Sequence, residues 1–233
     1  MDLSDGNPTD QGWTHRDMTT QSANYFHVDG PLCPQSNSAE VYAGGNQHMW
    51  CGQYTTAAAP WCGWMTLPGY GNGWDQSLVS QSIGAGSTIQ WACAWDSEPN
   101  YDKTFVQWWD DVLNTWTDVP GPLNGANAYY DGQGSDLAAG PYSDGAAVNT
   151  QWRFYFNADG GWSDEDGLWP TNEGAFKVDD ISVTGSATNF EDWDSGEACY
   201  AGSSTPTFWS ATSPPGYGDY SIIYNAVNVI QED

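Results

Sequence analysis

Hydrophobic and polar positions alternate along several short segments of the chain, a pattern typical of β-strands with one buried face. The clearest case is segment 86–95, in which Ile89, Trp91, Cys93 and Trp95 share one predicted face. The same pattern predicts strands over 76–83, 103–109, 113–119, 148–156 and 174–184. Little helical periodicity is found anywhere, so the sequence predicts an all-β protein.

Glycine, proline, asparagine and aspartate separate these segments, as expected for turns between strands. We expect 86–95, 103–109 and 113–119 to form a meander, with the acidic loop 96–102 joining its first two strands. Segment 120–146 is the least patterned stretch and is predicted to be a long surface loop. Short, regularly spaced strands without helices favour a jelly-roll β-sandwich over a βαβ fold.

The pattern changes after Gly185. Residues 189–196 resemble the start of a unit, and the motif PGYG at 68–71 occurs again at 215–218. We therefore predict a sandwich over residues 1–185, followed by a C-terminal extension or an incomplete second β unit over 186–233.

The chain is strongly acidic, with 30 aspartates and glutamates against 4 lysines and arginines and a formal net charge of -26. Nucleic acid and anionic membrane surfaces would be repelled, and no 18-residue apolar run is present that could insert into a bilayer. The 15 tryptophans indicate a folded chain rather than a disordered one. The scarcity of lysine and the abundance of glycine and tryptophan favour a secreted or cell-surface protein.

Most of the carboxylates lie in short clusters, and four cationic residues cannot neutralise them. Water and salt could screen them, as on a halophilic surface, but clustered carboxylate oxygens are also the ligands that calcium prefers. The loop clusters could equally be solvated turns. Three groups of residues are the predicted calcium ligands: Asp96, Glu98 and Asp102; Asp159, Asp164 and Asp166; and the pair Asp179 and Asp180.

The pair Asp179 and Asp180 is unusual because it lies within a predicted strand. Neighbouring strand residues point to opposite faces, so one aspartate should face inward or along the sheet edge, with Val178 and Ile181 at opposite parities. An inward carboxylate must be paired or metal-bound. This pair is therefore the strongest indication of a structural cation in the sequence.

The tryptophans divide into two groups. Trp91, Trp95, Trp109 and Trp152 fall on apolar strand faces and are predicted to lie in the core. Five others lie in glycine-rich loops, where they could stack on sugar rings or cover sheet edges. Four of them are the candidate ligand-binding residues: Trp64, Trp74, Trp162 and Trp169.

Five cysteines occur in the chain. Cys51 and Cys62 flank a short loop of the kind that a local disulfide closes, and a disulfide between them is predicted. Cys93 lies in the alternating segment 86–95 and is predicted to be a buried thiol.

Catalytic motifs are absent from the sequence, which contains no G-x-S-x-G, H-E-x-x-H or phosphate-binding loop. His15, His27 and His48 lack the spacing of zinc ligands. Carboxylates are frequent enough that two could lie at glycosidase separation by chance, but none stands out. The chain is therefore predicted not to be an enzyme, and a hydrolase or lyase acting on glycans is the alternative.

Three stretches resemble the MAM-like jelly-roll modules of secreted bacterial proteins, such as those found with immune-inhibitor-A-type metallopeptidases. They are PGYGNGWDQSLVS at 68–80, WDSEPNYDKTFVQ at 95–107 and WRFYFNADGGWSDEDGLWPTNEGAFKVDDISV at 152–183. The resemblance implies a concanavalin-like or galactose-binding-like sandwich with structural calcium, held in part by one aspartate of Asp179-Asp180-Ile181. The zinc motif of those peptidases is absent. The opening segment of such modules is matched better at Phe190-Glu191-Asp192 than at Leu3-Ser4-Asp5, which supports a second module beginning near 189.

These observations predict a non-catalytic, extracellular, calcium-stabilised β-sandwich module that binds a glycan or an extracellular protein. The alternative is a structural subunit of an extracellular filament, sheath or surface layer, in which copies of the chain assemble through their β-strands.

Overall fold

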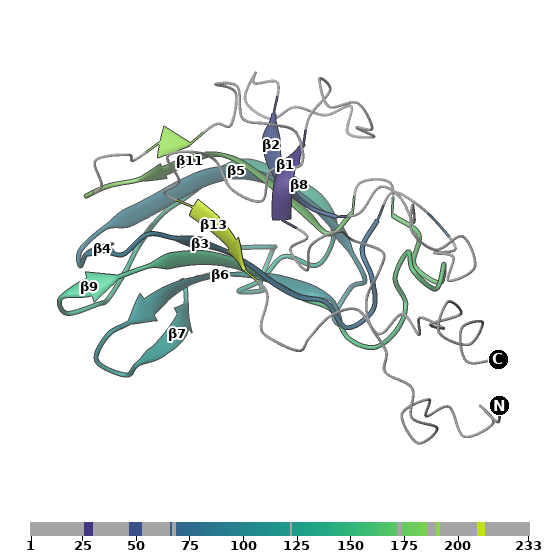
Figure 1. Cartoon of the computed structure of the whole chain (residues 1–233), viewed down its shortest axis with the longest axis horizontal. Coiled ribbons are helices and arrows are strands. Elements are labelled where there is room, and N and C mark those ends of the chain that lie inside the picture. Colours follow the sequence, from purple (N-terminus) through teal and green to yellow (C-terminus); the bar gives the residue numbers. More distant parts are fainter. Residues whose placement is uncertain are drawn as a thin grey trace, which may run out of the picture.

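The architecture is known from a computed structural model, which describes residues 26–29, 47–52, 66, 69–121, 123–171, 174–185, 190–191 and 209–212. Within these residues every regular element is a β-strand, and the strands form antiparallel sheets that face one another (Figure 1). No helix long and apolar enough to cross a membrane occurs in this part of the chain.

Two sheets make up the sandwich. The six-stranded sheet has the order β1-β2-β11-β5-β8, with β12 paired to β11. Its strands are β1 (Phe26–Asp29), β2 (His48–Cys51), β5 (Thr88–Ser97), β8 (Gly132–Ser143), β11 (Phe176–Val183) and β12 (Phe190–Glu191). The five-stranded sheet has the order β13-β3-β10-β6-β7. Its strands are β3 (Asp75–Ser80), β6 (Lys103–Asp110), β7 (Thr115–Asp118), β10 (Trp152–Asn157) and β13 (Trp209–Thr212). A separate pair consists of β4 (Ile83–Gly84) and β9 (Asn149–Thr150).

The order of the strands confirms the predicted jelly roll. Along the chain, β2, β5, β8 and β11 belong to one sheet and β3, β6, β7 and β10 to the other, so the backbone crosses between the sheets at almost every connection. Eight strands ordered β2-β11-β5-β8 and β3-β10-β6-β7 form the double Greek key of that fold.

The core lies between the sheets and is mainly aromatic. Ile89, Trp91, Cys93 and Trp95 of β5 are all buried, which confirms the face predicted from their alternation. Trp91 meets Phe154 of the opposite sheet edge to face, with 5.5 Å between ring centroids. Each large aromatic side chain buries about 150–250 Å², so a few such rings supply much of the burial that stabilises the sandwich.

The predicted meander is wrong. Segments 86–95 and 103–109 do not form one meander, because β5 and β6 belong to different sheets; only β6 and β7 form a hairpin. The acidic loop between β5 and β6 therefore crosses from one sheet to the other at the end of the sandwich. Periodicity reveals which residues share a face, but not which sheet a strand joins.

Segment 120–146 was predicted to be a loop, but half of it is strand β8, which pairs with β5 at the edge of its sheet. Its glycines conceal the pattern. Gly134 lies against the indole of Trp95, and a Cβ at this position would overlap that ring. Glycine at position 134, which suggests a loop in the sequence, is thus required for packing against Trp95.

Two short strands of the predicted segment 186–233 join the sandwich itself. β12 pairs with β11 in one sheet, and β13 pairs with β3 in the other. The rest of 186–233, including the second PGYG motif, lies outside the described residues.

Candidate functional site

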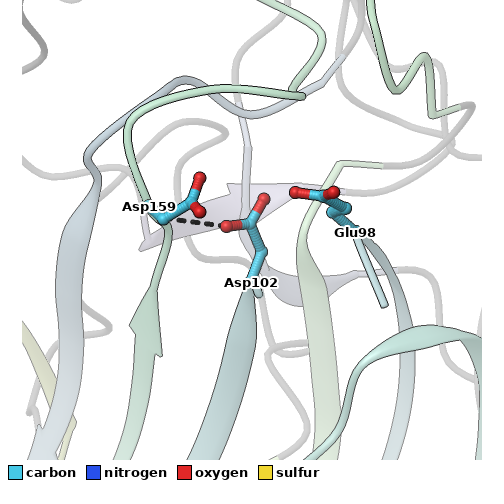
Figure 2. A group of neighbouring side chains, drawn as sticks. All are labelled: Glu98, Asp102 and Asp159. Carbon is cyan, nitrogen blue, oxygen red and sulfur yellow. Dashed lines mark hydrogen bonds between the residues drawn. The ribbon is translucent and has the colours of Figure 1, made fainter. Parts of the chain in front are cut away.

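Three carboxylates meet at one end of the sandwich. Glu98 follows β5, Asp102 precedes β6 and Asp159 follows β10, so strands of both sheets deliver them to the same place (Figure 2). One carboxylate oxygen from each lies within 4.8 Å of the other two. No other such group of three His, Cys, Asp or Glu side chains is found in the part of the chain that the structure describes. We call these residues the carboxylate trio.

The hydroxyl of Tyr70 forms hydrogen bonds with two residues of the trio. It donates a hydrogen bond of 2.6 Å to Asp102 Oδ2 and accepts one of 2.9 Å from the backbone N–H of Glu98. The other oxygen of Asp102 accepts a hydrogen bond of 2.8 Å from the backbone N–H of Asp159. Sequence reasoning missed Tyr70, although the repeated PGYG motif that contains it was an available signal.

Two carboxyl groups of the trio have raised pKa values. Burial raises the pKa of Asp102 to about 7, although hydrogen bonds from Tyr70 and Asp159 lower it, and the charges of Asp159 and Glu98 raise it further. Burial, followed by the charges of Asp159 and Asp166, also raises the pKa of Glu98. A cation would favour the ionised form of both groups.

The basic residues of the described chain are engaged away from the trio. Arg153 stacks on Trp116 and Tyr155, and Lys103 lies over Tyr129. Lys177 is buried in β11 of the six-stranded sheet. No ion pair between the trio and these residues is found among the described side chains. These three basic residues therefore do not neutralise the trio.

A hard cation suits this arrangement chemically. Calcium takes six to eight oxygen ligands, and carboxylates, backbone carbonyls and water all serve. The trio would supply three carboxylates, and an open hollow of about 430 Å³ adjoins Asp159 and leaves space for water. Asn72, Asp75 and Glu165 also line this hollow.

Asp164 was predicted to bind calcium, but the structure gives it a structural role. It is fully buried, and it accepts hydrogen bonds from the backbone N–H of Tyr70, the hydroxyl of Thr66 and both the N–H and the hydroxyl of Thr171. Burial raises its pKa to about 6 against the effect of those hydrogen bonds. Each of its oxygens accepts two hydrogen bonds from protein donors, whereas each oxygen of Asp102 accepts one. Asp164 therefore links the segment around residue 70 to the loop after β10.

Asp166 is likewise occupied by protein donors. Partial burial acts against ionisation, but donors from Leu168, Trp162, Asn72 and Ser163 outweigh it and lower the pKa of Asp166. The loop that was predicted to coordinate calcium is thus shaped by its own aspartates, and of its three candidates only Asp159 joins the trio.

The remaining predicted ligands lie elsewhere. Asp96 is within β5 and accepts a hydrogen bond of 3.1 Å from Gln133 of β8. Asp179 pairs with Ala92 of β5, six residues before Glu98, so roughly 20 Å of strand separates it from the trio.

A β-bulge explains the pair Asp179 and Asp180. The register between β11 and β5 shifts after Asp179, and Asp180 has a φ of 50°. The extra residue resets the alternation, so Val178 and Ile181 both lie in the core, contrary to the opposite parities expected of a regular strand. Asp179 is buried on the face of the sheet that it shares with Ala92, not in the core, and its carboxylate accepts the backbone N–H of Asp180 at 2.8 Å.

The candidate ligand-binding tryptophans differ in exposure. Trp74 is 1% exposed and packs edge to face against Tyr70 and Phe156 in the core. Trp162 is 53% exposed in the loop after β10, and Trp169 is partly buried in the same loop. Trp64 lies outside the described residues.

Trp109 was predicted to lie in the core, but it is on the outer face of the five-stranded sheet. Its neighbour Trp108 is the buried residue, because β6 alternates with Thr104, Val106 and Trp108 inward. Both faces of this strand carry large apolar residues, so alternation alone could not select between them.

Cys51 is a free thiol buried in the core cluster, so the predicted disulfide to Cys62 is not present in the structure; Cys62 lies outside the described residues. Burial raises the pKa of Cys51 well above that of an exposed thiol. Cys93 is also a free, buried thiol, as predicted.

Comparison with known proteins finds no family model that matches the chain and no curated protein with significant similarity to it. The resemblance to MAM-like modules therefore stays a prediction.

Proposed function

We propose that this chain is a non-catalytic extracellular β-sandwich module that calcium stabilises and that binds a glycan or an extracellular protein. The observation that supports it most directly is the carboxylate trio, whose oxygens lie within 4.8 Å of one another without a basic residue among the described side chains to neutralise them. The charge of -26 makes uptake of cations favourable across the whole molecule.

Calcium at the trio would join connections that belong to both sheets. Glu98 and Asp102 flank the crossing from β5 to β6, and Asp159 follows β10. An ion that binds only the folded arrangement raises stability by mass action. The expected role of the ion is therefore to hold the end of the sandwich in one conformation.

Binding is a better proposal than catalysis for this end of the molecule. The carboxyl group whose pKa is closest to neutral, Asp102, is fully buried, and both of its oxygens accept hydrogen bonds from protein donors. A general acid or base must reach a proton of its substrate. Asp102 is poorly placed to do so.

Thermal unfolding in calcium and in chelator tests the proposal. After dialysis against EGTA, the melting temperature should rise with calcium concentration, and magnesium at equal ionic strength should raise it less. Asp159→Asn should abolish most of this rise, whereas Asp118→Asn, which removes an exposed charge on β7, should leave it intact. A calcium response that is the same in both variants would reject the trio as the site.

Assembly through strand edges, the alternative function, receives less support. β8 forms one edge of its sheet but contains Gly140 and Pro141, and proline removes a backbone donor. At one edge of the other sheet, β7 has only four residues. Short or proline-bearing edges oppose pairing between copies. Light scattering at high protein concentration should therefore report a monomer, and filaments would favour the alternative.

A further inference from the structure

The outer face of the five-stranded sheet carries a group of partly exposed aromatic side chains. On β6, β7 and β10, every apolar residue that points away from the core on this face is aromatic. These side chains, together with Tyr129 from the segment before β8, form what we call the outer aromatic face: Phe105, Trp109, Trp116, Tyr129 and Tyr155.

The rings form two rows across the strands. Phe105 stacks on Tyr155 with 6.0 Å between centroids and contacts Tyr129 at 5.7 Å. Four residues further along β6, Trp109 meets Trp116 of β7 at 5.4 Å. At the rise of an antiparallel strand, the Cα atoms of Phe105 and Trp109 are about 14 Å apart, whereas the rings of Tyr155 and Trp116 approach each other more closely because both contact the Arg153 guanidinium. From Phe105 to Trp109 the face is longer than a single sugar ring and suits a short run of an extended polymer.

A polar ladder crosses the face between the two rows. Arg153 Nε donates to Gln107 Oε1 at 2.6 Å, and Gln107 Nε2 donates to Asp118 Oδ1 at 2.7 Å. The Arg153 guanidinium carbon lies 4.3 Å from the ring centroids of both Trp116 and Tyr155. These contacts fix the rings before any ligand arrives, which reduces the entropy lost on binding.

The charge of this face selects among possible occupants. Lys103 and Arg153 lie here beside Asp75 and Asp118, so positive and negative groups are balanced on an otherwise strongly acidic protein. An anionic polymer or a second copy of the chain would meet the repulsion of a charge of -26, whereas an uncharged polymer would not. A cationic partner would be attracted to the acidic remainder of the surface rather than to this balanced region.

We propose that the outer aromatic face binds a neutral polysaccharide whose sugar rings lie on the two aromatic rows and whose hydroxyls hydrogen-bond to the ladder of Arg153, Gln107 and Asp118. Flat aromatic rings bind the apolar faces of sugars, and a few fixed polar groups orient the hydroxyls. This inference rests on the proposed function and specifies both the ligand class and the surface.

Affinity electrophoresis in native gels containing hydroxyethyl cellulose or xylan tests the proposal, with polygalacturonate as the acidic polymer. The wild-type protein should be retarded by at least one neutral polymer and not by polygalacturonate. Trp116→Ala should weaken that binding about tenfold, as expected for the loss of a central aromatic contact, and Trp116→Tyr should restore most of it. Tyr101→Ala removes an exposed aromatic side chain outside this face and should have no effect.

A measurement on the wild-type protein covers the case in which Trp116→Ala fails to fold. Hydroxyl-radical footprinting with and without the retained polymer should show protection of Trp109, Trp116 and Tyr155, and none of Trp162. Protection of Trp162 alone, retardation by polygalacturonate alone, or no retardation by any of the polymers would overturn the inference. Association of the protein with itself that Trp116→Ala abolishes would assign the face to a second copy and would also overturn it.

The failure of this inference can be separated from the failure of the proposed function. Calcium-dependent melting is recorded on the same samples, and it depends on the trio rather than on the outer aromatic face. A normal calcium response without protection of the aromatic rows would reject only the glycan surface. Binding on those rows with no calcium response would reject only the calcium part of the proposed function.

Discussion

The hydroxyl of Tyr70 lies 2.6 Å from Asp102 Oδ2, and both side chains are completely buried at the end of the sandwich. The same hydroxyl accepts the backbone N–H of Glu98. One oxygen atom therefore satisfies a buried carboxylate and a buried backbone donor, both of which belong to the connection that crosses between the sheets.

Removal of this hydroxyl should destabilise the protein. Tyr70→Phe leaves both partners without it, and the cost of unsatisfied buried polar groups is about 1–3 kcal/mol for each group. For a domain of this size, each kcal/mol lowers the melting temperature by roughly 2–4 °C. Tyr101→Phe is the matched control, because Tyr101 is 60% exposed and its hydroxyl loss should change stability little. Equal melting temperatures for the two variants would show that the Tyr70 hydroxyl has no structural role.

The stability of the calcium-free protein should fall as the pH rises from about 4 to 7. The folded-state pKa of Asp102, about 7, and that of Asp164, about 6, lie above the ordinary value of 3.8, so the folded chain retains protons that the unfolded chain releases. The stability that these protons contribute is complete below the unfolded pKa and is lost as the pH passes the folded one. Each group contributes a slope of at most about 1.4 kcal/mol per pH unit.

Calcium should reverse part of this trend, because it favours ionised ligands. Denaturant unfolding at several pH values, in EGTA and in calcium, measures both slopes. The stabilisation by calcium should increase from pH 5 to pH 7, with Asp102→Asn as the variant that lacks the titrating group. A calcium effect that does not change over this range would show that ion binding does not depend on the ionisation of Asp102.

The strand faces could be predicted from the sequence better than the connections between the strands. Alternation in β5 identified the buried residues Trp91 and Cys93, because one strand face packs on the core and the other does not. β8 escaped prediction because glycines that fit beneath Trp95 give the same composition as a loop. The bulge at Asp180 could not be foreseen because local pattern does not reveal where the register shifts.

The site was predictable only as a set of candidates. Glu98 and Asp102 were grouped correctly because the chain is short between them, but their partnership with Asp159 depends on the way β10 lies beside β6. Asp164 and Asp166 have the same residue type as the trio and a similar setting in sequence. What distinguishes them is the number of protein donors around each carboxylate, which only the folded arrangement determines.

A methyl group at position 69 should disrupt the hydrogen bonds that Asp164 accepts. A Cβ on Gly69 would overlap the Asp164 carboxylate, which holds Tyr70 and Thr171 by hydrogen bonds. Overpacking of a buried site costs about 1–3 kcal/mol, so Gly69→Ala should lower the melting temperature and weaken calcium binding by displacing Tyr70. Gly84→Ala is the control, since its Cβ would meet nothing within 4 Å. If both variants melt alike, the close packing of Gly69 on Asp164 is not required.

The thiol of Cys51 should be protected in the folded protein. It lies in the core cluster, its strand neighbours are Phe26 and Phe176, and burial raises its pKa, so the reactive thiolate is disfavoured. Alkylation by iodoacetamide should therefore be at least about a hundredfold slower in native buffer than in guanidinium chloride, because exposure of the core requires opening of the sandwich. Mass spectrometry of peptides from the alkylated chain measures both rates. A peptide that links Cys51 to Cys62 under non-reducing conditions would contradict the free thiol and restore the disulfide expected from their spacing.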